Sequence, residues 1–297
     1  MIRQLVGCLK KDAFTFLPEN LQKKFETINI NVCYDANFII ETDCRRKVTI
    51  SLFAIEYIWS WIAYIYTIYD YCHKQGLVLS DVKAKWNTII RSTQVSETLD
   101  LQKVIDFNDG KELQFQNPWP KKFKNINPMN VDHPSVKRIN LLFHYVIIAM
   151  ILHEFGHIEK NHAEDYSSPS SHIEQEADLF SFNKYIEHVS SCQKDILENG
   201  AWVGVIFSQM ILLDRDGMNP EYRKIYGNPW QRISFAIAEI EKNGNFGDDA
   251  SMYAFLSLSF WLFLKKRGYD GPIDEKISFK DQYDLLSKCI YDMVKAC

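Results

Sequence analysis

The feature that most constrains this fold is an apolar run over residues 139–152 that leads directly into the motif HEFGH. Pro134 precedes the run, and proline suits the first turn of a helix because its missing N–H would be unpaired there anyway. The run has no narrow apolar stripe, and a helix that is apolar on all sides belongs inside a protein. We therefore predict a long buried helix that begins at Pro134 and carries the motif near its end.

Three residues of the motif have the types and the spacing of a zinc site. His153 and His157 are four positions apart, so on a helix they lie one turn apart on the same face. This spacing lets both imidazoles reach a single zinc ion at about 2.0–2.1 Å. Glu154 projects beside them, where it can take a proton from a water molecule that the metal polarises. The pattern alone is a weak signal, but its helical context and a third ligand downstream strengthen it.

The third ligand is expected from the sequence EQEAD, on a second helix that we predict to start at Ser171, a good N-cap. On this helix Glu174 and Asp178 share a face with the small Ala177 between them, whereas Glu176 lies about 200° from Glu174. We assign Glu174 as the third ligand and Asp178 as the acceptor for the spare N–H of a ligand histidine. The alternative is that Glu174 only completes a capping box with Ser171.

Length and composition indicate one mainly α body. The chain has 297 residues and no linker rich in Gly, Pro or Ser that would divide it, so we predict a single domain over residues 1–297. Residues 1–53 are expected to form a β-rich appendage on a helical body, residues 54–297. Short runs rich in Ile, Val and Thr predict a small antiparallel β-sheet in this appendage, with strands over residues 28–34, 38–42 and 47–52.

The helical body is expected to hold several further helices. Their apolar patterns cover residues 54–73, 96–107, 201–213, 252–265 and 283–296, and a proline-rich irregular connection covers residues 117–134. Glu56 lies in the first of these helices, which is otherwise apolar. A buried carboxylate needs a partner, so we expect Glu56 to support a ligand histidine or to pair with an arginine.

Charge and cysteine usage argue against several classes of function. The net charge is −4 with no basic tract, which gives no support to nucleic-acid binding. The seven cysteines are scattered and form no CxxC pair, which favours a reducing cytoplasm over a disulfide framework or a cysteine zinc site. No stretch reaches about 18 uninterrupted apolar residues, so we expect no integral membrane insertion, while peripheral association stays open.

A later segment, residues 219–233 (NPEYRKIYGNPWQRI), is a candidate source of a group that stabilises the oxyanion. Its two Asn-Pro steps predict turns. Zinc peptidases need a donor that faces the developing charge, commonly Tyr, His or Arg. Arg223 and Tyr222 are our candidates for this catalytic role, and the alternative is a surface turn with solvated arginines.

One more histidine near the motif needs an interpretation. His162 lies five residues after His157, so on a continuing helix it would face about 140° away. We therefore expect His162 to support the site or to lie at the surface, and not to bind the metal.

With these residues in view, the chain resembles the Lit phage-exclusion peptidases of bacteria. Besides the block ILHEFGH, the similar sequences are EYIW at residues 56–59, WPKK at 119–122, EQEAD at 174–178 and YRKIYGN at 222–228. The resemblance implies a helical, gluzincin-type zinc endopeptidase with one Zn²⁺ per chain that cuts elongation factor Tu in the cytoplasm. It also implies activation by a short peptide of a phage head protein, so that translation stops and the infection is aborted.

The sequence departs from the family at one turn. Where the family has a His-Pro step before YRKIY, this chain has Asn219 and Pro220, so we expect Asn219 or Arg223 to take the role of the missing histidine. Two alternatives stay open for the function. One is a gluzincin protease with a different target, such as a repressor or an antitoxin. The other is a zinc-containing binding module that does not cut, against which the intact Glu154 argues.

Overall fold

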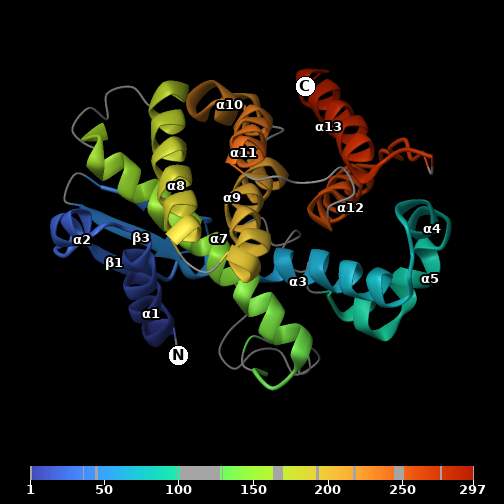
Figure 1. Cartoon of the computed structure of the whole chain (residues 1–297), viewed down its shortest axis with the longest axis horizontal. Helices are drawn as coiled ribbons and strands as arrows, with labels where there is room; N and C mark the ends of the chain where they lie inside the picture. Colours follow the sequence, from blue (N-terminus) through green and yellow to red (C-terminus); the bar gives the residue numbers. More distant parts are fainter. Residues whose placement is uncertain are drawn as a thin grey trace. The chain divides into compact units, whose positions relative to one another are not determined.

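The computed structural model describes residues 2–35, 37–43, 46–98, 100, 128, 130–162, 170–191, 194–216, 219–243, 251–274 and 276–296 (Figure 1). Most of these residues are helical, and a small three-stranded sheet lies near the N-terminus, which confirms the predicted mainly α class. The chain divides into two compact units. The first comprises residues 1–58, 108–113 and 141–244, and the second comprises residues 59–107, 114–140 and 245–297. The organisation as one domain stays a prediction.

The N-terminal part of the first unit holds two helices and the sheet. Their bounds are α1 Ile2–Thr15, α2 Glu19–Phe25, β1 Asn29–Cys33, β2 Ile40–Thr42 and β3 Lys47–Ser51. The three predicted strands are present, but the expectation of an antiparallel sheet is wrong for one pair: β2 pairs antiparallel with β3, whereas β1 pairs parallel with it. β3 lies between β1 and β2, so β1 pairs with a strand from which β2 separates it along the chain, and parallel pairs are made across such longer connections. Val48 and Ile50 of β3 are fully buried, and the central position covers them.

Within the described residues, five later helices contribute to the first unit, α7 from residue 141 onward. They are α7 Pro134–Glu159, α8 Ser171–Ser191, α9 Lys194–Asp216, α10 Pro220–Tyr226 and α11 Pro229–Asn243. Helix α8 packs against α9, α11 packs against both of them, and α10 packs against α8 (Figure 1). The predicted start of the long helix at Pro134 and the predicted start of the second helix at Ser171 are both confirmed.

Helix α7 is the core helix of the first unit. It is long and apolar enough to cross a membrane, yet most of it is buried inside the protein, as in the core helix of a soluble protein. Phe155, within the motif, is fully buried, and its ring centre lies 5.0 Å from that of Phe25 and 6.0 Å from that of Phe14. Positions 153 and 155 are about 200° apart on a helix. Packing of Phe155 on α1 and α2 therefore turns the histidines away from those helices.

Among the described residues, the second unit includes the later part of α3 (Leu52–Lys74), the start of α7 and several further helices. These include α4 Leu79–Ala84, α5 Trp86–Arg91, α12 Ser251–Lys266 and α13 Phe279–Ala296. Helix α12 packs against α13 and α4. The rings of Trp86 and Trp261 meet edge to face with 5.1 Å between their centres, which joins α5 to α12.

Most of the remaining sequence predictions can be compared with these elements. The helices predicted over residues 54–73, 201–213, 252–265 and 283–296 are confirmed by α3, α9, α12 and α13. The helix predicted over residues 96–107 and the irregular connection predicted over residues 117–134 fall largely outside the described residues. Glu56 is buried in α3, but within the described part of the chain its Oε2 atom has no hydrogen-bond partner and no ion pair reaches it. Neither of its two expected partners is present there.

Candidate metal centre and active site

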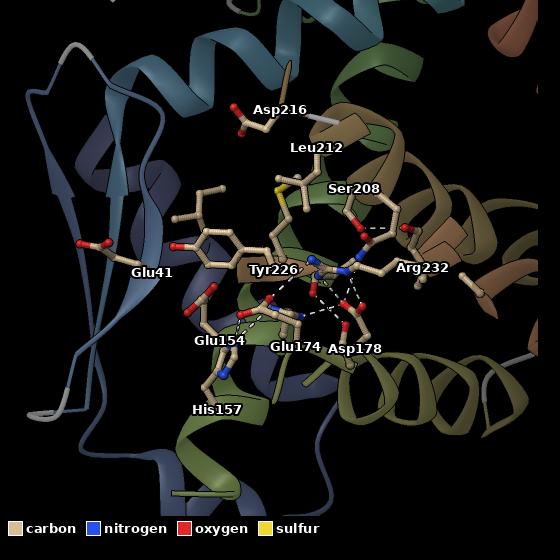
Figure 2. Close-up of a pocket in the computed structure, with 18 of the residues that line it drawn as sticks. Glu41, Glu154, His157, Glu174, Asp178, Ser208, Leu212, Asp216, Tyr226 and Arg232 are labelled. Carbon is tan, nitrogen blue, oxygen red and sulfur yellow. Dashed lines mark hydrogen bonds and ion pairs between the residues drawn. The ribbon is translucent and has the colours of Figure 1, made fainter. Parts of the chain in front are cut away.

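The first unit contains a cavity of about 360 Å³ in which sequences far apart along the chain meet (Figure 2). Helices α7 to α11 supply most of its wall, and strand β2 with the residues just before it and His162, just after α7, supply the rest. His153, Glu154, His157, Glu174 and Asp178 all line it. The HEFGH motif of α7 and the EQEAD sequence of α8 therefore face the same space.

The two helices approach closely because each has a small residue at their contact. Ala177 is fully buried, and a Cβ atom added to Gly156 would lie 2.9 Å from the Cα atom of Ala177. One turn further along α8, Ser181 donates a hydrogen bond of 2.8 Å to the backbone oxygen of Ala149 in α7. These contacts fix the register in which Glu174 reaches the two histidines of the motif.

Four potential ligand atoms, two ring nitrogens and both oxygens of Glu174, lie close together. Nε2 of His153 lies 3.1 Å from Nε2 of His157. Oxygens of Glu174 lie 3.2 Å from the first nitrogen and 3.6 Å from the second. Two ligands held at 2.0–2.1 Å by a tetrahedral zinc ion are about 3.3–3.4 Å apart. The observed separations lie on both sides of this value, so the three side chains fit such an ion as they stand.

The other nitrogen of His153 determines how this ring is oriented. Its Nδ1 atom lies 2.9 Å from Oδ1 of Asp178. An ionised carboxylate can only accept, so Nδ1 of His153 donates to Asp178. In the neutral ring that a metal requires, the lone pair of Nε2 would therefore face Glu174 and His157. On the second ring, Nδ1 of His157 lies 3.1 Å from Nδ1 of His162.

Asp178 is itself held by buried groups. Arg232 donates to its two oxygens from Nε at 2.6 Å and from Nη2 at 2.8 Å, and Gln209 donates from Nε2 at 3.0 Å. Nη1 of Arg232 also lies 3.5 Å from Glu174. Burial would raise the pKa of Asp178, but the Arg232 guanidinium holds it well below its usual range. For Glu174, too, burial is outweighed, and His153 and Arg232 lower its pKa.

Electrostatics at the cluster favour one positive charge beside a neutral imidazole. Burial lowers the pKa of His153, but the Asp178 and Glu174 carboxylates outweigh it and raise this pKa to about 10. The pKa of His157 shifts the other way, to about 3, because of burial and the nearby charge of His153. His157 is therefore in the neutral form that binds metals. The two carboxylates, Asp178 and Glu174, would stabilise a metal cation at the cluster as they stabilise the charge of His153.

Glu154 lies between the cluster and the edge of the sheet. Its carboxylate is within 4.8 Å of ring nitrogens of His153 and His157, and the backbone N–H of Thr42, the last residue of β2, donates to it. Burial raises the pKa of Glu154 to about 8, against the opposing charge of His153. A cation at the cluster would lower this pKa through the same attraction. Glu154 would then be ionised and able to accept a proton.

Most of the segment over residues 219–233 is helical, which corrects the expectation that it consists mainly of turns; only Asn219, Gly227 and Asn228 lie outside α10 and α11. Asn219 accepts hydrogen bonds from two backbone N–H groups at the start of α10, and Pro220 takes the first helical position. At the start of α11, Asn228 accepts a hydrogen bond of 3.0 Å from the backbone N–H of Trp230. Each Asn-Pro step begins a helix because asparagine caps free N–H groups and proline has none to cap.

These two helices change which side chains face the cavity. Of the two donors predicted, Tyr222 lines the cavity and Arg223 is not among its lining residues. Asn219 is occupied as a helix cap and does not line it either. Tyr226, one turn after Tyr222, lies on the wall beside it with 4.7 Å between the ring centres. Arg232 is the arginine of this segment that contacts the cluster (Figure 2).

Sequence reasoning missed the contacts of Arg232, Gln209 and His162. The signal for Arg232 is the second Asn-Pro step, which starts α11 and places this residue in its first turn. His162 was expected on another face of a continuing helix, but α7 ends at Glu159 and Asn161 has a φ of 57°. The chain turns back at Asn161, so His162 returns to His157. Gln209 carried no signal in the sequence.

A comparison with family models identifies the protein at the level of its family. The model described as peptidase U49 matches residues 48–241, more than half of the chain. The chain belongs to the peptidase U49 family. The matched span of this U49 peptidase includes the HEFGH motif, the EQEAD sequence and Arg232, so the family assignment and the cavity concern the same part of the chain. No curated protein and no solved structure matches the chain.

Proposed function

We propose that this U49 peptidase is a zinc-dependent endopeptidase with one Zn²⁺ per chain, held by His153, His157 and Glu174. The observation that carries the proposal is the set of contacts among these three side chains. Nε2 of His153 lies 3.1 Å from Nε2 of His157 and 3.2 Å from Oε2 of Glu174, and Oε1 of Glu174 lies 3.6 Å from Nε2 of His157. These separations suit tetrahedral zinc.

The chain's own groups supply the proton transfers. A bound zinc ion would polarise the substrate carbonyl and the attacking water. Glu154 accepts the proton from that water and passes it to the leaving amine, and the N–H of Thr42 holds its carboxylate in place. Asp178 keeps His153 in the metal-binding tautomer, and Arg232 keeps Asp178 ionised.

The substrate is proposed to bind along the edge of the sheet. Strand β2 pairs with β3 on one side, and within the described chain no strand covers its other side. Residues 38–41 line the cavity, and Thr42 contacts Glu154. An extended peptide that adds to this edge as a further strand would form main-chain hydrogen bonds and bring a carbonyl to the cluster.

A tyrosine is our candidate for the donor that stabilises the oxyanion. Tyr222 and Tyr226 line the cavity, whereas the donors of Arg232 are engaged with Asp178 and Glu174. Burial raises the pKa of Tyr222, so its hydroxyl stays protonated and can donate at neutral pH. We therefore place Tyr222 first and Arg223, which is not among the lining residues, after both tyrosines.

The proposed target follows from the resemblance to the Lit peptidases, the prototype of the U49 family. On that basis the target is elongation factor Tu in the bacterial cytoplasm, the activator is a phage head peptide, and the outcome is phage exclusion. A different target, such as a repressor or an antitoxin, would use the same site chemistry. A non-cleaving zinc module is disfavoured by Glu154, a buried carboxylate within 4.8 Å of both histidine nitrogens and additional to the three proposed ligands.

The test is to map new protein termini in a bacterial cytosolic extract. The zinc-loaded protein is incubated with extract, with and without a phage head peptide, and Glu154→Gln serves as the matched inactive control. We expect new termini with the wild type that are absent with Glu154→Gln, and we expect them in elongation factor Tu. New termini in another protein would favour the alternative target. An identical set of termini for both proteins in every condition would contradict peptidase activity at this site.

A further inference from the structure

His162 lies directly behind one of the two proposed metal ligands. Its Nδ1 atom is 3.1 Å from Nδ1 of His157, and its Nε2 atom is 3.0 Å from Oε2 of Glu176. The side chain of His162 is 10% exposed, so the ring is largely covered. Three side chains thus form a row that starts at the cluster and ends at a carboxylate on α8.

The backbone after α7 places His162 in this row. The helix ends at Glu159, and Asn161 has a φ of 57°, in the left-handed region. Asparagine is among the residues that tolerate this conformation best after glycine, and it commonly ends helices in this way. The turn reverses the chain, so His162, which would face away from His157 on a continuing helix, lies beside it.

The proton positions along the row follow from what each group can do. For Nε2 of His157 to offer a lone pair to a metal, its Nδ1 must carry the proton and donate to Nδ1 of His162. His162 can accept there only as the neutral ring with its proton on Nε2. That proton is then donated to Glu176, whose ionised carboxylate can only accept. Each member of the row has one assignment that satisfies its neighbours.

We propose that His162 and Glu176 are positioning residues that hold His157 in its metal-binding tautomer, an inference that rests on the proposed zinc site. Asp178 does the same for His153 directly, so each histidine ligand has an acceptor behind it. The three acids of EQEAD then have three different tasks. Glu174 faces the metal position, Asp178 supports His153, and Glu176 supports His157 through His162.

The test measures zinc affinity by competition with a chelator in full-length protein, because affinity reports on the ligands without any substrate. His162→Leu removes the acceptor, and His162→Asn keeps an acceptor oxygen near the place of Nδ1. Glu176→Gln weakens the acceptor at the end of the row. His172→Leu is the control, because His172 is 78% exposed and lies 3.7 Å from Glu176 without contacting His157. The visible spectrum of the cobalt-substituted protein reports ligand geometry, and circular dichroism reports folding.

We expect His162→Leu to lower zinc affinity by about 10–100-fold, the range for groups that orient metal-bound histidines. His162→Asn should retain most of the wild-type zinc affinity. Glu176→Gln should lower zinc affinity less than His162→Leu does, and His172→Leu should bind zinc with wild-type affinity. The cobalt spectrum should change with His162→Leu and not with His172→Leu. If folded His162→Leu keeps wild-type zinc affinity and cobalt spectrum while Glu174→Gln loses zinc, the inference is overturned and the proposed zinc site stands. A wild-type protein without zinc affinity would overturn both.

Discussion

At the scale of single residues, neighbouring acids of EQEAD have different surroundings, and these decide what a substitution does. Glu174 is buried and faces both motif histidines. Glu176 is partly exposed and faces His162 instead. The geometric rule that separates positions 174 and 176 by about 200° on a helix therefore leads to two separate roles.

Glu174→Gln should abolish stoichiometric zinc binding, whereas Glu176→Gln should retain one zinc ion per chain with weaker affinity. Glutamine keeps the size of the side chain but loses the charge that a metal ligand supplies. Elemental analysis of dialysed protein would measure both. Equal zinc content in the two variants at saturating zinc would show that Glu174 has no special part in binding the ion.

Removal of Arg232 should destabilise the protein more than removal of an exposed arginine. The Arg232 side chain is 4% exposed and is the bidentate partner of buried Asp178. Arg232→Ala removes the bidentate partner of that buried carboxylate, so we expect a loss of about 3–5 kcal/mol in the free energy of unfolding. The Arg215 side chain is 32% exposed and pairs with Asp216 at 3.3 Å, so Arg215→Ala should lose only about 1 kcal/mol. Urea unfolding of both variants checks this, and similar losses would contradict the buried role of Arg232.

Glu56 gives a prediction with a defined dependence on pH. Burial raises its pKa from 4.5 to about 8, so the folded chain holds a proton that the unfolded chain releases. Stability of the wild type should therefore fall as pH rises from about 4.5 to 8. Glu56→Gln removes this titration and should be more stable than the wild type at pH 7, by on the order of 3 kcal/mol. The advantage should vanish near pH 4, and an advantage that does not change with pH would contradict this account.

At the scale of elements, the site depends on how closely α7 and α8 approach each other. Gly156 and Ala177 form the contact, and Ser181 adds a hydrogen bond to the backbone of α7. The third proposed ligand comes from a different helix than the first two. Any change that separates the helices therefore moves Glu174 relative to the histidines.

Gly156→Ala separates two opposing effects. Helix propensity alone predicts that alanine stabilises α7 by roughly 0.5–1 kcal/mol. The added Cβ would lie 2.9 Å from the backbone of Ala177 and 3.2 Å from Cβ of Phe180, neither of which can move without shifting α8. We expect packing to prevail, with a net loss of about 1–3 kcal/mol and weaker zinc binding. Thermal unfolding and chelator competition would check it, and a more stable variant with unchanged zinc affinity would contradict it.

At the scale of the whole molecule, the sequence predicts the long elements and the paired motifs, because both depend on local periodicity. Helices α7 and α8 begin at the expected residues, and Glu174 faces the histidines as their spacing requires. The order of the three strands could not be predicted, since it depends on which strand the surrounding helices bury most. The contacts of His162 and Arg232 could not be predicted either. One depends on a single left-handed residue, and the other on the packing of α11.

The central claim is that Glu154 transfers protons at a zinc ion held by α7 and α8. The most direct test is the cleavage rate of zinc-loaded Glu154→Gln against zinc-loaded wild type on the same protein substrate, with zinc content measured on the same samples. A general base contributes about 10²–10⁴-fold, so we predict a loss of that size with one zinc ion per chain in both proteins. A cleavage rate of zinc-loaded Glu154→Gln equal to that of the wild type would contradict the account.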